Sequence, residues 1–493
     1  MSGKSTIVAS GSHSTPAATP AKKVGFISLG CPKNLVDSEV MMGMLAQAGA
    51  VLTTRADEAD VIVVNTCSFI DRAQRESVDT ILEMARLKAS GRAQKLVVAG
   101  CLVERYGDEI RKNIPEVDAV VGTGELDRIL SATGVASEPK SNSPFVILQS
   151  RPEADARDAQ GRFSRDRWDG AIADLPKYLY DENTPRVLAT PGYSAYIKIA
   201  EGCDHPCSFC IIPQLRGKFR SRRFESVIAE AERLARSGVR EITLIGQDTT
   251  CYGEDLGLKD GLALLLDKLA AIRELKWIRF LYAYPNKITS RLLETIAAHE
   301  NICSYIDVPL QHASASVLKR MKRGGSADLF LRSIEKMRRT VPGLTLRTSF
   351  IVGFPGETEQ EFMELCDFVR EAHFDWMGAF AYSDEEGSTS FTLDPKLPAR
   401  EIERRRKHLM GIQCRISRKA KRALVGKEFD VLLEGTSEET ELLLQGRTAM
   451  HAPDIDGKVL INDMPESCEA RVGEFYRCQI TEAQDYDVVA KIL

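Results

Sequence analysis

Three cysteines lie close together in the stretch EGCDHPCSFC, with three and two residues between them: Cys203, Cys207 and Cys210. Soft thiolates at such close spacing select iron-sulfur clusters or zinc. Structural zinc sites normally close with a fourth protein ligand, and using the neighbouring His205 would strain tetrahedral geometry on so tight a loop. Three thiolates instead suit a 4Fe-4S cluster with one iron open to a small molecule. We expect a cluster here, with zinc and three unligated thiols as the alternatives.

Three further cysteines are far apart in the sequence, but each directly follows a short apolar run. Cys31, Cys67 and Cys101 are separated by 36 and 34 residues. One β-α-β unit takes about 30 residues or more, so this spacing predicts that the thiols lie at the same end of successive parallel strands. If those strands are neighbours, about 4.8 Å apart, the sulfurs can meet at the carboxyl edge of the sheet. We expect a second 4Fe-4S cluster, the alternative being three buried cysteines that act as small apolar side chains.

Continuous apolar runs in the first segment predict the strands that would position the second trio. They are VGFISLG at 24–30, ADVIVVNT at 59–66 and KLVVAG at 95–100. Runs rich in Val and Ile are typical of strands that crossover helices cover on both faces. The segment 23–135 is therefore predicted to be an open parallel α/β sheet.

The rest of the chain predicts two more folded segments, so that the whole is an α/β protein. Strand candidates alternate with amphipathic helical patterns at 195–200, 241–246, 277–283, 304–309, 344–352 and 376–382. Six such units over 191–424 predict a (β/α) barrel that is incomplete compared with an eightfold one. From 425 to 493, short alternating strands separated by Gly, Asp and Pro predict a small antiparallel β-barrel of the oligonucleotide-binding type.

Two stretches are predicted to lie outside these segments. Residues 1–22 are rich in Ser, Ala, Thr and Gly and contain no acid, which predicts a disordered tail; an organelle-targeting peptide is the alternative. Residues 136–190 are polar and show no sustained period, which predicts a linker or an insertion.

Length and composition exclude several classes of protein. At 493 residues the chain exceeds the roughly 250–300 residues at which single cores stop growing, so two or three domains are expected. No apolar run reaches membrane-spanning length, and no membrane partner is expected. The twelve cysteines are thinly spread, and no charged-then-apolar leader precedes Val24. These features predict a cytoplasmic protein that keeps its thiolates for metal.

The motifs around the cysteines resemble a known enzyme family. The motif C-x-x-x-C-x-x-C after the first barrel strand resembles that of the radical S-adenosylmethionine superfamily. The motifs LGCPKNLVDSE, NTCSFID and AGCL resemble those of the methylthiotransferases within that superfamily. The resemblance to the methylthiotransferases extends from Lys23 to the end of the chain. The resemblance implies a C-terminal TRAM domain, two 4Fe-4S clusters, S-adenosyl-L-methionine as methyl donor and radical source, and a low-potential electron donor as partner. It also implies that the protein inserts sulfur and a methyl group at a carbon-hydrogen bond.

Other motifs indicate the branch of the family. CPKNLVDSE, EGCDHPCSFCIIP, LIGQDT, IDVPLQHAS and RTSFIVGFPGET are most similar to the enzymes that modify the β-carbon of an aspartate in small-subunit ribosomal protein twelve. Transfer-RNA adenosine enzymes of the family tend to show Gln-Met-Asn where this chain has Pro32, Lys33 and Asn34. The resemblance implies a basic ribosomal protein as substrate, either free or within the ribosome. A transfer-RNA adenosine methylthiotransferase and a non-catalytic iron-sulfur protein that binds ribosomes remain the alternatives.

Polar residues at the predicted strand ends are candidates for contacts with S-adenosylmethionine. They are Gly246, Gln247 and Asp248 after the second strand, Gln311 and His312 after the fourth, and Arg347 within the fifth. Each could equally be a structural polar group. The remaining cysteines share no pattern and are assigned to packing, although a ligand role for Cys251 stays open; they are Cys251, Cys303, Cys366, Cys414, Cys468 and Cys478.

Charge favours a protein partner over RNA. Residues 425–493 contain 6 Lys plus Arg against 15 Asp plus Glu. A barrel that binds RNA should be basic, because phosphate contacts supply most of the sequence-independent affinity. The acidic balance fits a strongly basic protein, with an ordinary solvated acidic surface as the alternative. The stretch 400–424, with 10 basic and 2 acidic residues, predicts a long helix that is either solvated or uses a basic face to contact the barrel or ribosomal RNA.

Overall fold

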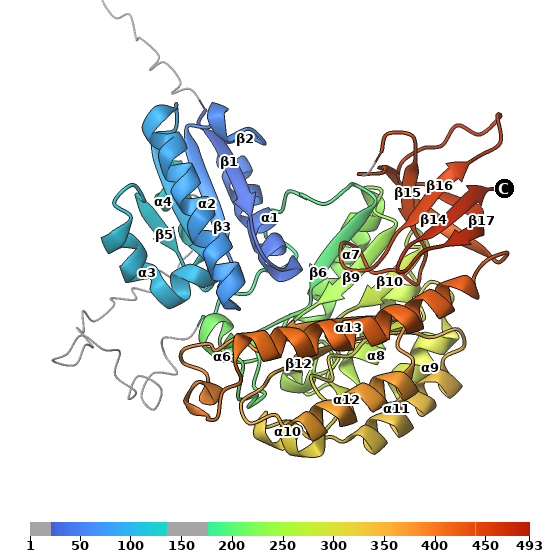
Figure 1. The fold of residues 1–493 in the computed structure, drawn as a ribbon. Coiled ribbons are helices and arrows are strands. Elements are labelled where there is room, and N and C mark those ends of the chain that lie inside the picture. The colour runs from blue at the N-terminus through green and yellow to red at the C-terminus, as the bar shows by residue number, and fades with distance from the viewer. Residues whose placement is uncertain (1–20, 136–175, 439) are drawn as a thin grey trace, which may run out of the picture.

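The computed structural model describes residues 21–135, 176–438 and 440–493. The predicted tail at 1–22 therefore lies almost entirely outside the described residues, as does most of the predicted linker at 136–190. The described chain folds into an N-terminal sheet domain, a central barrel-like domain and a C-terminal closed barrel (Figure 1). No helix in these described ranges is long and apolar enough to cross a lipid bilayer.

The N-terminal domain is a five-stranded parallel sheet in the order β2-β1-β3-β4-β5. Its strands are β1 Lys23–Ser28, β2 Val51–Thr53, β3 Val61–Thr66, β4 Lys95–Gly100 and β5 Ala119–Val121. Its helices are α1 Pro32–Gln47, η1 Ala56–Glu58, α2 Asp71–Ser90, α3 Cys101–Asn113, η2 Leu126–Arg128 and α4 Ile129–Thr133. The three strands predicted from sequence are adjacent, and β2 and β5 flank them as short edge strands.

Alternation along the strands explains why both faces of this sheet are covered. Val61 and Val63 pack with α1 on one face, whereas Ile62 and Val64 pack with α2 and α3 on the other. All six residues of β3 are buried, as expected for the central strand of a parallel sheet with helices on both sides.

The central domain contains six parallel strands in two three-stranded sheets, β6-β9-β10 and β11-β12-β13. These strands are β6 Ser194–Lys198, β9 Glu241–Ile245, β10 Trp277–Phe280, β11 Tyr305–Asp307, β12 Thr345–Val352 and β13 Trp376–Ala381. A parallel bridge between Ile278 and Ile302 links the sheets, while in the described chain β6 and β13 do not pair. The six-unit incomplete barrel predicted from sequence is confirmed.

These strands are connected by helical segments, the longer of which pack against them. The helical segments are α6 Ile212–Arg216, α7 Phe224–Arg236, η3 Glu254–Leu256, α8 Gly261–Ala270, η4 Pro285–Lys287, α9 Ser290–Ala298, α10 Ala315–Arg320, α11 Ala327–Thr340, α12 Glu359–Ala372 and η5 Thr389–Thr392. A small antiparallel pair, β7 Ala200–Glu201 and β8 Arg220–Ser221, flanks the loop that carries the first cysteine trio.

The C-terminal domain is a closed barrel in the order β14-β15-β16-β18-β17. Its strands are β14 Glu428–Thr436, β15 Leu444–Arg447, β16 Val459–Asp463, β17 Phe475–Ala483 and β18 Val488–Ile492. A fully antiparallel barrel was expected, but β16 and β18 pair in parallel. The other four pairings are antiparallel. The last strand, β18, closes the barrel by pairing in parallel with β16 and antiparallel with β17.

The predicted basic helix exists as α13, Ala399–Arg422, which runs alongside the central domain to the barrel (Figure 1). Arg418 pairs with Asp485 of the C-terminal domain at 2.6 Å, and the ammonium of Lys421 lies 3.6 Å from the centre of the Trp376 ring. Arg405 is buried against Glu357 at 2.7 Å. Part of the basic charge of this helix therefore holds the two domains together, and the rest is solvated.

A loop of the small barrel fills one end of the central barrel. Glu241, fully buried, pairs with Arg447 at 2.6 Å, and the Tyr305 hydroxyl donates to Asp456 at 2.7 Å. The indole N–H of Trp376 donates to the carbonyl of Met450 at 2.7 Å. Because this end is closed by the C-terminal domain, the carboxyl ends of the six strands are left to face the N-terminal domain.

Candidate active site between the two cysteine trios

Cys31, Cys67 and Cys101 meet at the carboxyl edge of the N-terminal sheet, as the spacing predicted. Cys31 directly precedes α1, Cys67 directly follows β3, and Cys101 is the first residue of α3 directly after β4. The approach is close: a Cβ built on Gly30, whose φ is +88°, would lie 2.6 Å from the Cβ of Cys67. Only glycine fits this contact and this backbone conformation, so Gly30 allows the loops that carry Cys31 and Cys67 to touch.

Burial shapes the chemistry of this trio. It raises the pKa of Cys101 to about 12 and also raises the pKa of Cys67, and in both cases the neighbouring Cys31 thiol adds to the shift. Thiols of this kind remain protonated at neutral pH until a metal replaces the proton. Metal loading at this site is therefore expected to release protons.

Cys203, Cys207 and Cys210 lie on one loop after β7. Its backbone curls tightly, with the amide of Cys210 donating to the carbonyl of Cys207 at 3.2 Å, and the Arg323 guanidinium donates to the Cys207 sulfur at 3.4 Å. Burial raises the pKa of Cys203 to about 11 and that of Cys210 to about 12. Three thiols thus converge in a partly buried loop with a cation beside one of them.

The donor sets fit iron-sulfur clusters better than single metal ions. Within the described ranges, three ligand atoms all within 4.8 Å of one another are found at His205, Asp248 and Cys251 but at neither cysteine trio. One tetrahedral zinc ion, with Zn–S bonds of about 2.3 Å, would draw its sulfurs to about 4 Å from one another. Wider sets of three thiols with no fourth protein donor match cubane clusters that keep one iron open.

His205, Asp248 and Cys251, whose ligand atoms do lie this close together, are joined by hydrogen bonds. The Asp248 carboxylate accepts hydrogen bonds from the His205 ring nitrogen at 2.6 Å, from the Cys251 thiol at 3.1 Å and from the Thr250 hydroxyl at 2.5 Å. The His205 ring stacks on Tyr284 with centroids 3.8 Å apart. Asp248 thus holds the loop that carries Cys203, Cys207 and Cys210 against the end of β9.

The short helix α6 lies next to both trios. Cys101 packs against Ile211 and Leu215, and Ile211 directly follows Cys210. Arg216, at the end of α6, is buried and hydrogen-bonds Asp37 of α1 at 2.5 Å. The Arg216 charge also lowers the pKa of Cys101 against the larger effect of burial. One element of the central domain therefore borders both candidate cluster sites.

A buried network of charged side chains joins the N-terminal domain to the central domain beside α6. Lys198 pairs with Asp37 and, at 2.5 Å, with Glu201, and Gln247 donates to Glu201 at 2.7 Å. Burial alone would raise the pKa of Glu201, but Lys198 and Arg216 outweigh it and lower that pKa to about 2. All four charged groups are nearly solvent-free, so the network is a fixed electrostatic link between α1 and the end of β9.

The residues proposed for contacts with S-adenosylmethionine have different surroundings. The side-chain oxygen of Gln247 is buried and has no hydrogen-bond partner in the described structure. Gln311 adopts a φ of +71°, and its backbone pairs with β12 at the carboxyl end of the strands. Gly246 directly follows β9. These three lie at the strand ends, where the sequence placed them.

His312 and Arg347 do not face an open mouth. His312 is fully buried, its Nδ1 accepts from the amide of Ser314 at 3.0 Å, and burial lowers its pKa to about 3, which keeps the ring neutral. Arg347 pairs with Asp307 at 2.9 Å and with Asp456 at 3.4 Å. Arg347 therefore has the environment of a structural polar group, whereas the buried Nε2 of His312 has no hydrogen-bond partner among the described residues.

Sequence reasoning missed the charged network and Lys33. Lys198 offers a signal, because a lysine in the apolar strand SAYIKIA is costly to bury and an acidic partner offsets that cost. Lys33 is buried with its ammonium 3.3 Å from the centre of the Tyr282 ring. Nothing in the local sequence indicates that this side chain crosses to the other domain.

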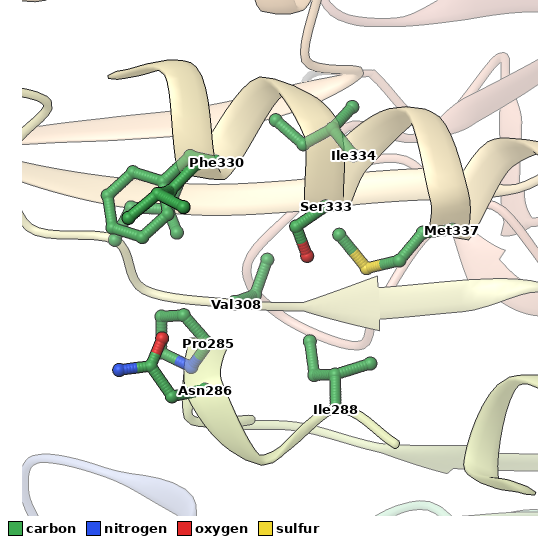
Figure 2. A pocket seen from close by; sticks show the side chains of 10 residues that line it. Pro285, Asn286, Ile288, Val308, Phe330, Ser333, Ile334 and Met337 are labelled. Atoms are coloured by element: carbon green, nitrogen blue, oxygen red, sulfur yellow. The ribbon is translucent and has the colours of Figure 1, made fainter. Parts of the chain in front are cut away.

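A separate apolar pocket lies between η4, the segment after β11 and α11 (Figure 2). Its lining includes Ile288, Val308, Phe330, Ile334 and Met337, with Ser333 as a polar group. None of the six cysteines lines it, so it is distinct from the site described above.

Comparison with known proteins places these features in a family. Residues 23–122 match the uncharacterized protein family UPF0004, 197–369 the radical SAM superfamily and 425–493 the TRAM domain. The ribosomal protein uS12 methylthiotransferase RimO of Koribacter versatilis is 70% identical over 96% of this chain and 97% of the relative. The proteins of that name from Solibacter usitatus and Trichlorobacter lovleyi are 59% and 47% identical, each over 96% of this chain and over 95% and 98% of the relative.

Among solved structures, the radical S-adenosylmethionine methyltransferase TsrM of Kitasatospora setae is similar, with a TM-score of 0.49 and 16% identity over 73% of each chain. The family assignment follows from the sequence relatives, which cover nearly the whole chain and share its three domains. This chain belongs to the RimO family of radical S-adenosylmethionine methylthiotransferases.

Proposed function

We propose that this chain attaches a methylthio group to the β-carbon of an aspartate in ribosomal protein uS12. The observation that carries the proposal is the 70% identity, over nearly the full length, to a curated uS12 methylthiotransferase. The two cysteine trios on either side of α6 support it, because the reaction needs a sulfur source and a radical source near one carbon atom.

The cysteine trios would hold two 4Fe-4S clusters. Cys203, Cys207 and Cys210 are the ligands of the radical cluster, and Cys31, Cys67 and Cys101 are the ligands of the auxiliary cluster. When bound, the clusters and S-adenosylmethionine supply the methyl group, the sulfur and the radical that removes hydrogen from carbon, and a low-potential donor must supply the electron. The protein's own part is to orient these groups and keep water away.

Residues at the strand ends would receive S-adenosylmethionine. Gln247 is the best-placed candidate, because its amide nitrogen is fixed on Glu201 while its buried oxygen lacks a partner. Gly246, Asp248 and Gln311 lie at the same edge. Arg347 would act one step away, by pairing with Asp307 and Asp456 at the base of the barrel, and His312 stays a candidate contact through its unpartnered Nε2.

The small barrel would help to attract the substrate. Ten of its acidic side chains are exposed: Glu428, Asp430, Glu438, Glu441, Asp454, Asp463, Glu466, Glu469, Glu474 and Glu482. A surface of this charge repels RNA and attracts a basic ribosomal protein. We infer that the enzyme works in the cytoplasm, where this substrate is made and assembled into ribosomes.

Charge reversal on the barrel should weaken substrate capture without changing the chemistry. In the variant Glu466→Lys/Glu469→Lys, we expect the KM for uS12 to rise about three- to tenfold at low salt while kcat stays the same, because surface charges steer association. The difference should shrink at high salt, where screening shortens the range of these charges. A matched Lys427→Glu variant should lower KM; equal KM values in all three proteins would show that the acidic surface has no role.

The substrate assignment is tested by offering two substrates in parallel. Reconstituted protein, S-adenosylmethionine and a strong reductant are incubated with a uS12 peptide or with transfer RNA, and the products are weighed. We expect one methylthio group on the peptide and none on RNA. A product on RNA alone would overturn the assignment, and failure to form deoxyadenosine under any condition would favour a non-catalytic iron-sulfur protein.

A further inference from the structure

The side chain of Lys33 crosses the seam between the two cysteine trios. Lys33 is the second residue of α1, two positions after Cys31, and is 8% exposed. Its ammonium lies 3.3 Å from the centre of the Tyr282 ring and 3.5 Å from the carbonyl oxygen of Gly246. Tyr282 and Gly246 belong to the central domain, where they follow β10 and β9.

This ammonium lacks an acidic partner. No ion pair within residues 21–135, 176–438 and 440–493 includes Lys33, whereas the nearby buried cations Lys198 and Arg216 each reach Asp37 and Glu201. A buried cation without a carboxylate is costly, and an aromatic face with one distant carbonyl offsets only part of that cost. Beyond its hydrogen bond to the Gly246 carbonyl, the Lys33 ammonium therefore keeps N–H donor capacity for an incoming anion.

The support under Lys33 is strained in a way typical of functional sites. Tyr282 adopts a φ of +64°, in the left-handed region that bulky residues rarely occupy. Asp307 holds it there by accepting from the Tyr282 amide at 3.0 Å, and the Thr249 amide donates to the Tyr282 carbonyl at 3.2 Å. The backbone is thus held out of its preferred region, and the ring lies directly beneath the ammonium.

We propose that Lys33 binds the side-chain carboxylate of the substrate aspartate and thereby places its β-carbon between the two trios. The inference rests on the proposed function and names the residue that selects the substrate. The carboxyl carbon is bonded directly to the β-carbon, so an ion pair at Lys33 holds a group that is only one bond away from the reacting carbon. A neutral asparagine lacks the charge that Lys33 would pair with.

Binding of matched peptides tests this role independently of turnover. The affinity of reconstituted enzyme is measured for a uS12 peptide and for the same peptide with asparagine at the modified position. The original chain should prefer aspartate by about tenfold or more, since hydrogen bonds between charged groups are the strong ones. In Lys33→Met this preference should disappear, in Lys33→Arg it should remain, and the exposed Lys268→Met serves as the matched control.

Product formation in the same samples separates the explanations. In Lys33→Met, methylthio product per deoxyadenosine formed should fall at least about tenfold. Retention of the aspartate preference by Lys33→Met would overturn the inference. An equal loss of deoxyadenosine or of iron would also overturn it, because Lys33 would then serve S-adenosylmethionine or a cluster. If the original chain leaves the aspartate peptide unmodified, the proposed function itself fails.

Discussion

Replacing Cys203 with alanine is expected to abolish both deoxyadenosine and methylthio product, with rates at least about 10⁴-fold below the original chain. Cys203 is one of only three thiols on its loop, and the described structure offers no fourth cysteine there to replace it. Loss of one ligand should remove the whole radical cluster, so iron should fall from about eight to about four per chain. Iron analysis and chromatography of the reaction mixture measure both effects.

Replacing Cys67 gives the contrasting result. Cys67→Ala should also lose about four irons and all methylthio product, but it should still form deoxyadenosine, because the other trio is untouched. Cys468→Ala, on a barrel segment remote from both trios, serves as the control and should retain iron and activity. If Cys67→Ala stopped deoxyadenosine formation as completely as Cys203→Ala, the division of work between the trios would be wrong.

Asp37→Asn is expected to destabilise the docking of the N-terminal domain. The Asp37 carboxylate lies between Lys198 and Arg216, all three nearly solvent-free. Removing one partner from a buried ion-pair network costs about 3–5 kcal/mol, because the remaining charges lose their compensation. The first thermal unfolding transition should therefore fall by about 10 °C.

The exposed pair of Asp57 and Arg55 provides the matched control. Asp57→Asn removes a carboxylate from the same domain, and its transition should not move measurably, since exposed pairs contribute little. Asp37→Asn should also reduce methylthio product more than deoxyadenosine, because the network aligns the two trios. An unchanged transition temperature would mean that the domains are held together by other contacts.

The position of Cys31, Cys67 and Cys101 could be predicted because each of them directly follows an apolar run, whereas Cys203, Cys207 and Cys210 could be grouped from their close spacing alone. Strand order and the carboxyl edge then bring distant thiols together, as Cys31, Cys67 and Cys101 show. The short edge strands β2 and β5 were not predicted. The order of the domains could be predicted because the pattern of apolar residues changes along the chain.

The surroundings of polar side chains were harder to predict. His312 and Arg347 were candidates for contacts with S-adenosylmethionine because of their place after the fourth strand and within the fifth, but sequence position does not say which way a side chain points. The link between Asp37 and Lys198 depends on how two separate domains dock, and no local pattern records that. Lys33 is the clearest case, since its neighbours Gly246 and Tyr282 come from more than 200 residues away.

The parallel contact between β16 and β18 has a practical consequence for work with this protein. β18, Val488–Ile492, bonds to β16 on one side and to β17 on the other, so the final residues of the chain complete the barrel. Deleting them would expose two unsatisfied strand edges, which are templates for intermolecular pairing. Shortened versions should therefore precipitate during expression, and an affinity tag is better placed ahead of residue 21 than in place of the last strand.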